Sequence, residues 1–133
     1  MANLGTVAIT SQAYPIEYAL QLRGRLGWRA TEPGPQVIRL LFDQPQTLSR
    51  IRLVFEETEI QRTQEFVLRW SADSGRSFSE IVRQQWNFSP PGTVRETEDY
   101  TVELCGVTVL ELRIVPDQAG GNARASLASL RLA

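Results

Sequence analysis

The fold of this chain is decided by residues 66–78, which read FVLRWSADSGRSF. Phe66, Leu68 and Trp70 alternate with Val67 and Arg69. Because successive side chains of a strand point to opposite faces, this alternation predicts a strand with one face turned toward a core.

The second half of this stretch predicts a tight hairpin. Residues 71–78 fit the pattern S-x-D-x-G-x-x-aromatic, which is the Asp-box pattern of sialidase propellers. The pattern occurs once, whereas a propeller would need it repeatedly. We therefore interpret it structurally: the Asp73 carboxylate accepts backbone N–H groups, and Gly75 takes a positive φ.

Further runs of alternating or continuous apolar residues predict an all-β chain. Counting the strand at 65–70, eight strands are expected, at residues 5–10, 37–42, 51–55, 65–70, 78–83, 100–104, 110–114 and 126–132. Turn-forming residues separate them at 32–35, 43–46, 73–75, 89–92 and 116–122. Only residues 16–25 could form a short helix, with Pro15 in its first turn. We predict one antiparallel β-sandwich domain over residues 1–133.

Composition excludes several functions. The net charge of −1 gives no general attraction for nucleic acid, and no apolar stretch is long enough to span a membrane. There is no histidine, and Cys105 is the single cysteine, so neither an ordinary zinc site nor a disulfide is expected. We expect Cys105 to be a buried apolar residue. The first ten residues lack the features of a secretory signal, which favours a cytoplasmic protein.

In this order, the expected strands resemble the discoidin family, also called the coagulation-factor type C domain, within the galactose-binding-like jelly rolls. Gly27-Trp28-Arg29-Ala30 followed by residues 35–42 and 48–53 resembles that family's tryptophan loop and next two strands. Residues 66–78, 111–116 and 127–132 resemble its hairpin element and last two strands. The resemblance covers most of the chain after residue 27. It implies an eight-stranded antiparallel jelly roll with ligands bound by loops at one end.

The chain departs from that family at its calcium site. Family members with a structural calcium usually carry an acidic loop before the tryptophan and a glutamate in the last strand. Here residues 22–26 read LRGRL, and Ser129 stands in the last strand. The cysteines that bridge the ends of many secreted members are also missing. We therefore expect no bound metal and no cofactor.

Residues 83–91, which read RQQWNFSPP, are the first candidate ligand-binding segment. We expect several of these side chains to project from a loop that ends in a Pro-Pro-Gly turn. Trp86 would stack on a sugar ring, Arg83 would bond hydroxyl groups, and Gln85 and Asn87 would set orientation. The alternative is that Trp86 and Phe88 plug one end of the sandwich, because large aromatic side chains more often belong to a core.

Four further residues complete the candidate set because they are expected in loops or at exposed positions. They are Arg29, Arg62, Asn122 and Arg124. The resemblance implies that Trp28 packs in the core, so we expect the side chain of Arg29 to be the exposed one of the pair.

The leading hypothesis is a non-catalytic module that recognises carbohydrate or glycoconjugate. The alternative is an intracellular protein-interaction or homo-oligomerisation module. A third and less favoured reading is a glycosidase using Glu56, Glu57 and Glu59, since that chemistry needs two carboxylates. Acidic residues past a strand end are, however, usually solvated or paired with an arginine, here Arg62.

Overall fold

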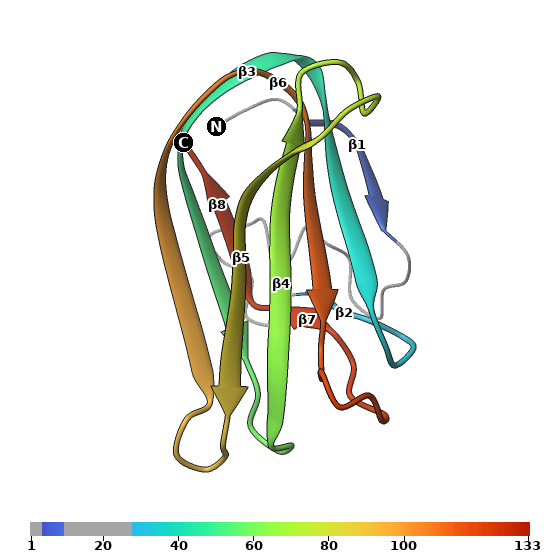
Figure 1. Cartoon of the computed structure of the whole chain (residues 1–133), viewed down its shortest axis with the longest axis vertical. Coiled ribbons are helices and arrows are strands. Elements are labelled where there is room, and N and C mark those ends of the chain that lie inside the picture. The colour runs from blue at the N-terminus through green and yellow to red at the C-terminus, as the bar shows by residue number, and fades with distance from the viewer. Residues whose placement is uncertain (1–3, 10–27) are drawn as a thin grey trace.

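The chain folds into a β-sandwich (Figure 1). The structure, a computed structural model, describes the backbone of residues 4–9 and the whole of residues 28–133. The helix expected over 16–25 and the loop at 22–26 lie outside these residues. The strands are β1 (Leu4–Ile9), β2 (Trp28–Arg29), β3 (Gln36–Glu56), β4 (Arg62–Ser71), β5 (Ser79–Phe88), β6 (Arg95–Val115), β7 (Ser126–Leu127) and β8 (Ser129–Leu132).

Two long strands take part in both layers of the sandwich. β3 and β6 pair antiparallel along their lengths and arch together over one end of the molecule (Figure 1). Before the arch, β3 pairs with β1 on one side and with the last part of β6 on the other. That part of β6 pairs in turn with β4, and β4 pairs with the edge strand β5. This is the front layer. After the arch, β3 pairs with the first part of β6 on one side and with β8 on the other, forming the back layer.

Two predictions from the sequence are wrong at the arches, where residues expected between strands lie inside long strands. Residues 43–46 were predicted as a turn, but they lie inside β3, where the pairing with β6 shifts register between Leu41 and Gln46. The predicted strands at 100–104 and 110–114 are likewise one strand, bent near Gly106, whose φ is +75°. Register shifts let a strand bend without ending, so turn-forming residues fit within it. Cys105 is exposed at this bend, so its predicted burial is wrong.

The core lies between the two layers and follows the predicted alternation. Phe66 and Leu68 of the front layer and Leu53 and Phe55 of the back layer are fully buried. The rings of Phe55 and Phe66 lie 5.2 Å apart between centroids and join the layers. Trp28 is also buried in this core, as the family resemblance implied.

The predicted hairpin between β4 and β5 is confirmed. The Asp73 carboxylate accepts hydrogen bonds from the Ser77 backbone N–H at 2.9 Å and from the hydroxyls of Ser71 and Ser77, each at 2.6 Å. These bonds, with that of the Ser71 hydroxyl first, lower the pKa of Asp73 well below its usual range. Gly75 has a φ of +91°.

A polar cluster is buried on the inner face near the end opposite the arches. Glu96 is fully buried, and its Oε1 accepts a bond of 3.3 Å from Gln64 Nε2. Its Oε2 accepts no hydrogen bond from a described donor, and the Glu98 carboxyl lies within hydrogen-bonding range of the Glu96 carboxyl. Burial is the main cause that raises the pKa of Glu96 to about 9, and the adjacent Glu98 carboxyl adds to the effect. The folded protein therefore holds Glu96 protonated at neutral pH.

We predict that stability falls as pH rises from about 5 to about 9. In the unfolded chain Glu96 ionises near its ordinary value of 4.5, whereas in the folded chain its pKa is about 9, so the folded state binds the extra proton between these values. Glu96→Gln should flatten this dependence and stabilise the protein at pH 8. Thermal unfolding at several pH values measures it. The exposed Glu103 of the same strand gives the control Glu103→Gln, which should behave like the wild type.

Candidate binding site at the loop end

Four connections gather at the end of the sandwich that the arches leave open, at the bottom of Figure 1. They follow β2, β3, β5 and β6, and span residues 30–35, 57–61, 89–94 and 116–125. The arches close the opposite end. The family resemblance implied ligand-binding loops at one end, and this is the end with connecting loops from both layers.

A pocket of about 230 Å³ lies between two of these connections. One wall is the end of β3 and the loop that follows it, residues 56–60. The other wall combines Arg29 of β2 with Asn122, Arg124 and Ser126.

The second wall owes its shape to an extended segment that leads into β7. Asn122 and Arg124 are exposed, whereas Ala123 and Ala125 are buried, so side chains alternate between pocket and core. Backbone bonds hold the segment: the N–H groups of Ala30 and Gly34 donate to the carbonyls of Ala125 and Ala123 at 2.9 and 3.2 Å. β2 pairs with β7 and sets Arg29 opposite Ser126, which places it on the same wall.

The polar side chains of this pocket are available to a ligand. Arg29, Asn122 and Arg124 are exposed, and their side chains form no hydrogen bond or ion pair with any residue that the structure describes. The same holds for the Glu59 carboxylate on the other wall. Beside it, Ile60 is 43% exposed and is the one large hydrophobic side chain exposed in the described part of the chain. The pocket thus offers donors, an acceptor and an apolar contact.

Glu57 shapes the loop that forms the first wall. Its Oε2 accepts the backbone N–H groups of Glu59 and Ile60 at 3.0 and 3.3 Å, and its Oε1 accepts Arg62 Nε at 2.7 Å. Burial raises the pKa of Glu57, but the bonds from Glu59 and Arg62 outweigh it and lower the pKa overall. The expected pairing with Arg62 is confirmed for Glu57, whereas Glu56 pairs with Arg95. Glu57 is a structural group here, with both oxygens occupied.

Arg62 was predicted to lie in a loop and contact a ligand, and that placement is wrong. It begins β4, and its side chain is 1% exposed. Besides Glu57, its Nη1 donates to the Pro116 carbonyl at 2.6 Å and to Gln64 Oε1 at 3.1 Å, and the guanidinium lies 4.8 Å from the Phe88 ring centroid. All these partners lie inside the fold, so Arg62 positions the loops after β3 and β6 instead of contacting a ligand.

We predict that Arg62→Met costs about 3–5 kcal/mol of unfolding free energy, because it leaves Glu57 and the Pro116 carbonyl without their donor in a poorly hydrated site. Urea denaturation measures the loss. Arg124→Met is the matched control: its guanidinium is exposed and unpaired among the described residues, so it should change stability by no more than about 0.5 kcal/mol. Equal stability of the two variants would contradict the role given to Arg62.

The segment 83–88 was predicted as a loop, but it is the second half of β5. Trp86 and Phe88 lie opposite Gln64 and Arg62 of β4 and point inward. Phe88 is fully buried, and Trp86 packs against the core with its Nε1 buried. The alternative interpretation, in which Trp86 and Phe88 fill the interior of the sandwich, therefore holds. The two side chains do not form an exposed stacking platform. Arg83, Gln85 and Asn87 point outward from the front layer and are exposed.

The structure thus brings together three predicted residues, Arg29, Asn122 and Arg124, and separates them from the β5 set. Sequence reasoning missed Glu59 and Ile60 as parts of a binding wall. The sequence did contain a signal for Ile60. It is the one apolar residue in a polar run after a strand, so it does not continue an alternating pattern and cannot be assigned to the buried face of a strand.

Among the described residues, no three or more side chains of histidine, cysteine, aspartate or glutamate lie close enough together to hold a metal ion. In the same part of the chain, no helix has the length and apolar character needed to span a membrane.

No protein-family model matches the chain, and no curated protein matches it significantly. Solved structures do resemble it. A pectin-binding carbohydrate-binding module shares 16% identity over 99% of this chain and 91% of its own length, with a TM-score of 0.67. A family 32 carbohydrate-binding module from Clostridium perfringens, in complex with galactose, shares 16% identity over 96% and 91%, with a TM-score of 0.64.

A third similar structure is part of an enzyme. A Ruminococcus gnavus fucosidase in complex with fucose shares 7% identity over 96% of this chain but only 24% of its own length, with a TM-score of 0.70. At such identities the likeness establishes the fold. Family 32 modules have the galactose-binding-like, discoidin-like jelly roll, so the fold implied by the sequence resemblance is confirmed.

Proposed function

We propose that this chain is a non-catalytic carbohydrate-binding module that takes its ligand in the loop-end pocket. The observation that carries the proposal is that three polar side chains on one wall, Arg29, Asn122 and Arg124, have no hydrogen-bond or ion-pair partner in the part of the chain that the structure describes. Exposed polar groups held on a paired backbone can bond ligand hydroxyls with little further ordering, which limits the entropy lost on binding.

The chemistry of the pocket suits a sugar. The two guanidinium groups and the Asn122 amide donate to hydroxyl oxygens, and the Glu59 carboxylate accepts from hydroxyl groups. Ile60 offers an apolar contact for the C–H face of a sugar ring. The volume of about 230 Å³ is below the range of about 300–1,000 Å³ typical of small-molecule pockets, so we infer that a terminal sugar unit is recognised and not the middle of a chain.

Similar structures support the same class of ligand. One binds pectin and another was solved with galactose, and both are binding modules of about the same length as this chain. In this chain Glu57 is engaged by backbone N–H groups and Arg62, which removes one carboxylate from the suggested glycosidase arrangement. The protein-interaction alternative invoked Trp86 or Phe88 at an interface, but Phe88 is already buried within the chain.

A glycan array followed by calorimetry tests the proposal. We expect binding of a terminal monosaccharide or disaccharide, weakened about tenfold or more by Arg29→Ala and by Arg124→Ala, because a hydrogen bond to a charged group contributes roughly 1.5–3 kcal/mol. Arg131→Ala is the control, since Arg131 is an exposed arginine on β8 in the back layer and outside this pocket.

Two results would contradict this function. One is the absence of any glycan ligand for the folded domain. The other is a ligand whose affinity is unchanged in both Arg29→Ala and Arg124→Ala while Arg131→Ala reduces it. Thermal unfolding of each variant confirms that the fold is intact, which is expected because these side chains have no partner in the described structure.

A further inference from the structure

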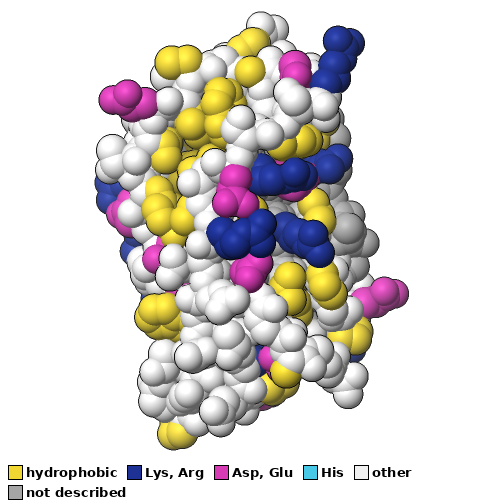
Figure 2. All heavy atoms as spheres, in the orientation of Figure 1, with side chains coloured by type: hydrophobic (Ala, Val, Ile, Leu, Met, Phe, Trp, Pro, Cys, Tyr) yellow, Lys and Arg dark blue, Asp and Glu magenta, His cyan; other side chains and the backbone are white. Residues whose placement is uncertain are grey.

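A second depression, of about 380 Å³, lies on the outer face of the front layer. Figure 2 shows basic side chains gathered with acidic ones on this face. We call it the arginine face. Its lining includes four arginines from four adjacent strands, Arg39 (β3), Arg113 (β6), Arg69 (β4) and Arg83 (β5).

The Glu111 carboxylate holds two of these guanidinium groups in place. Glu111, with a side chain only 4% exposed, lies between Arg39 Nε at 2.7 Å and Arg69 Nη2 at 2.6 Å. Both guanidinium groups also lie over the Phe78 ring, 5.4 and 4.5 Å from its centroid. These contacts hold the arginines in place before any ligand arrives.

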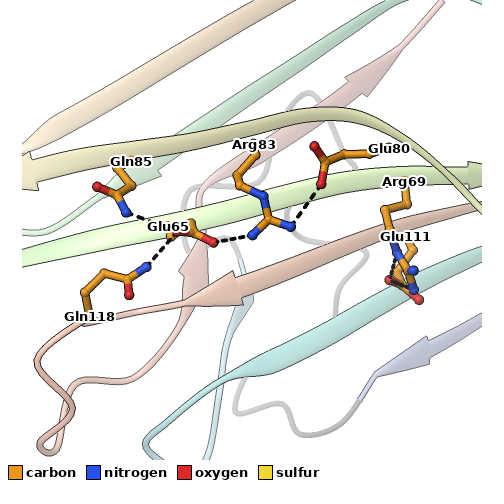
Figure 3. Close-up of polar contacts among 7 residues, drawn as sticks. All are labelled: Glu65, Arg69, Glu80, Arg83, Gln85, Glu111 and Gln118. Atoms are coloured by element: carbon orange, nitrogen blue, oxygen red, sulfur yellow. Dashed lines mark hydrogen bonds and ion pairs between the residues drawn. The ribbon is translucent and has the colours of Figure 1, made fainter.

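Glu65 organises the other side of the face (Figure 3). It accepts Arg83 Nη1 at 2.8 Å, Gln85 Nε2 at 3.1 Å and Gln118 Nε2 at 2.9 Å. The Gln85 bond lowers the pKa of Glu65 most among these contacts, so the carboxylate is charged at neutral pH. Arg83 also bonds Glu80 at 2.9 Å. Each of these carboxylates is therefore already paired with a guanidinium of the face.

Arg113 is the one arginine of the face that forms no ion pair with these described carboxylates. It is exposed, and it forms no hydrogen bond or ion pair with any described residue. Its cross-strand neighbours are Val67 and Val37, and Val67 is in turn opposite Arg83. Arg113 and Arg83 thus stand two strands apart, roughly 10 Å between Cα atoms, with an apolar valine between them. Among the described residues, four arginines face three carboxylates, Glu65, Glu80 and Glu111, so one positive charge of this group is unbalanced.

We propose that the arginine face is a second binding site, for a saccharide that carries a carboxylate. Arg113 pairs with the carboxylate through its planar fork, for which an arginine is better suited than a point charge. Val37 and Val115, which are half-buried in the lining, contact the C–H face of the sugar ring. A nucleic acid fits less well, because phosphate backbones are held by several unpaired cations and the chain has a net charge of −1.

This proposal shares with the loop-end function only the class of ligand, and the two sites use different residues. The probe is trigalacturonate, and its fully methyl-esterified form is the uncharged control of the same shape. NMR titration locates the site, and calorimetry measures affinity. We expect binding of trigalacturonate, with amide shifts near Val67 and Arg113, and at least tenfold weaker binding of the ester. Affinity should fall with added salt.

The variants separate the two sites. Arg113→Gln should weaken trigalacturonate binding at least tenfold, and Arg113→Lys should weaken it less, because the charge remains but the fork is lost. Arg131→Gln, on the back layer, should leave it unchanged, and Arg124→Ala, at the loop end, shows whether the uronate binds there instead.

Three results would overturn the proposal: no binding of trigalacturonate, equal affinity of the wild type and Arg113→Gln, or loss of binding in Arg124→Ala alone. The last result would place the uronate in the loop-end pocket and leave the proposed function standing. Conversely, failure of every neutral glycan to bind would count against the loop-end function without touching the arginine face. Arg113 has no partner in the described structure, so its variants should remain folded.

Discussion

The structure depends on the continuous pairing of β3 with β6. Each strand passes from one layer to the other without ending, so the two layers are joined at one end by main-chain hydrogen bonds across the arch as well as by side-chain packing (Figure 1). This leaves a single end for the connections that follow β2, β3, β5 and β6. Among the described connections, those of both layers therefore meet at this end, and a binding pocket built from loops of both layers can form there.

Arg62 connects the buried core to the loops at that end of the sandwich. Its guanidinium is buried against Phe88 and bonds both Glu57 and the Pro116 carbonyl, which belong to two different connections. Burying a charge is costly unless it is paired and hydrogen-bonded, and here each of the contacts replaces water that the arginine has lost. The loop after β3 is thus tied to the sandwich interior, while Glu59 and Ile60, at its tip, stay exposed.

The sequence predicted the strands that have alternating apolar residues, because alternation reflects a local rule of strand geometry. It could not predict the arches, since Asp43 to Gln46 and Gly106 have the composition of turns and only pairing with a distant strand keeps them extended. The second half of β5 was mistaken for a loop because its outer face is polar and its inner face mixes Trp86 with Gln84, so the alternation of apolar and polar residues is hidden. Arg62 was placed in a loop because its partners, Pro116 and Phe88, are distant in sequence. Asn122 and Arg124 were predicted because they lie in an expected loop, and Arg29 because the resemblance makes the adjacent Trp28 a packing residue.

The use of arginine alone as the basic residue has a physical consequence in this fold. A guanidinium can bond a carboxylate through its edge and cover an aromatic ring with its face at the same time, as Arg39 and Arg69 do with Glu111 and Phe78. A lysine ammonium has no flat face to stack and no fork to pair, so it could not hold a buried glutamate in this way. Among the described arginines, those with carboxylate partners stabilise the sheet. Others, including Arg29, Arg113 and Arg124, form no side-chain hydrogen bond or ion pair with a described residue. On the arginine face, where four described arginines meet three carboxylates, the chain carries a local positive charge that its net charge of −1 conceals.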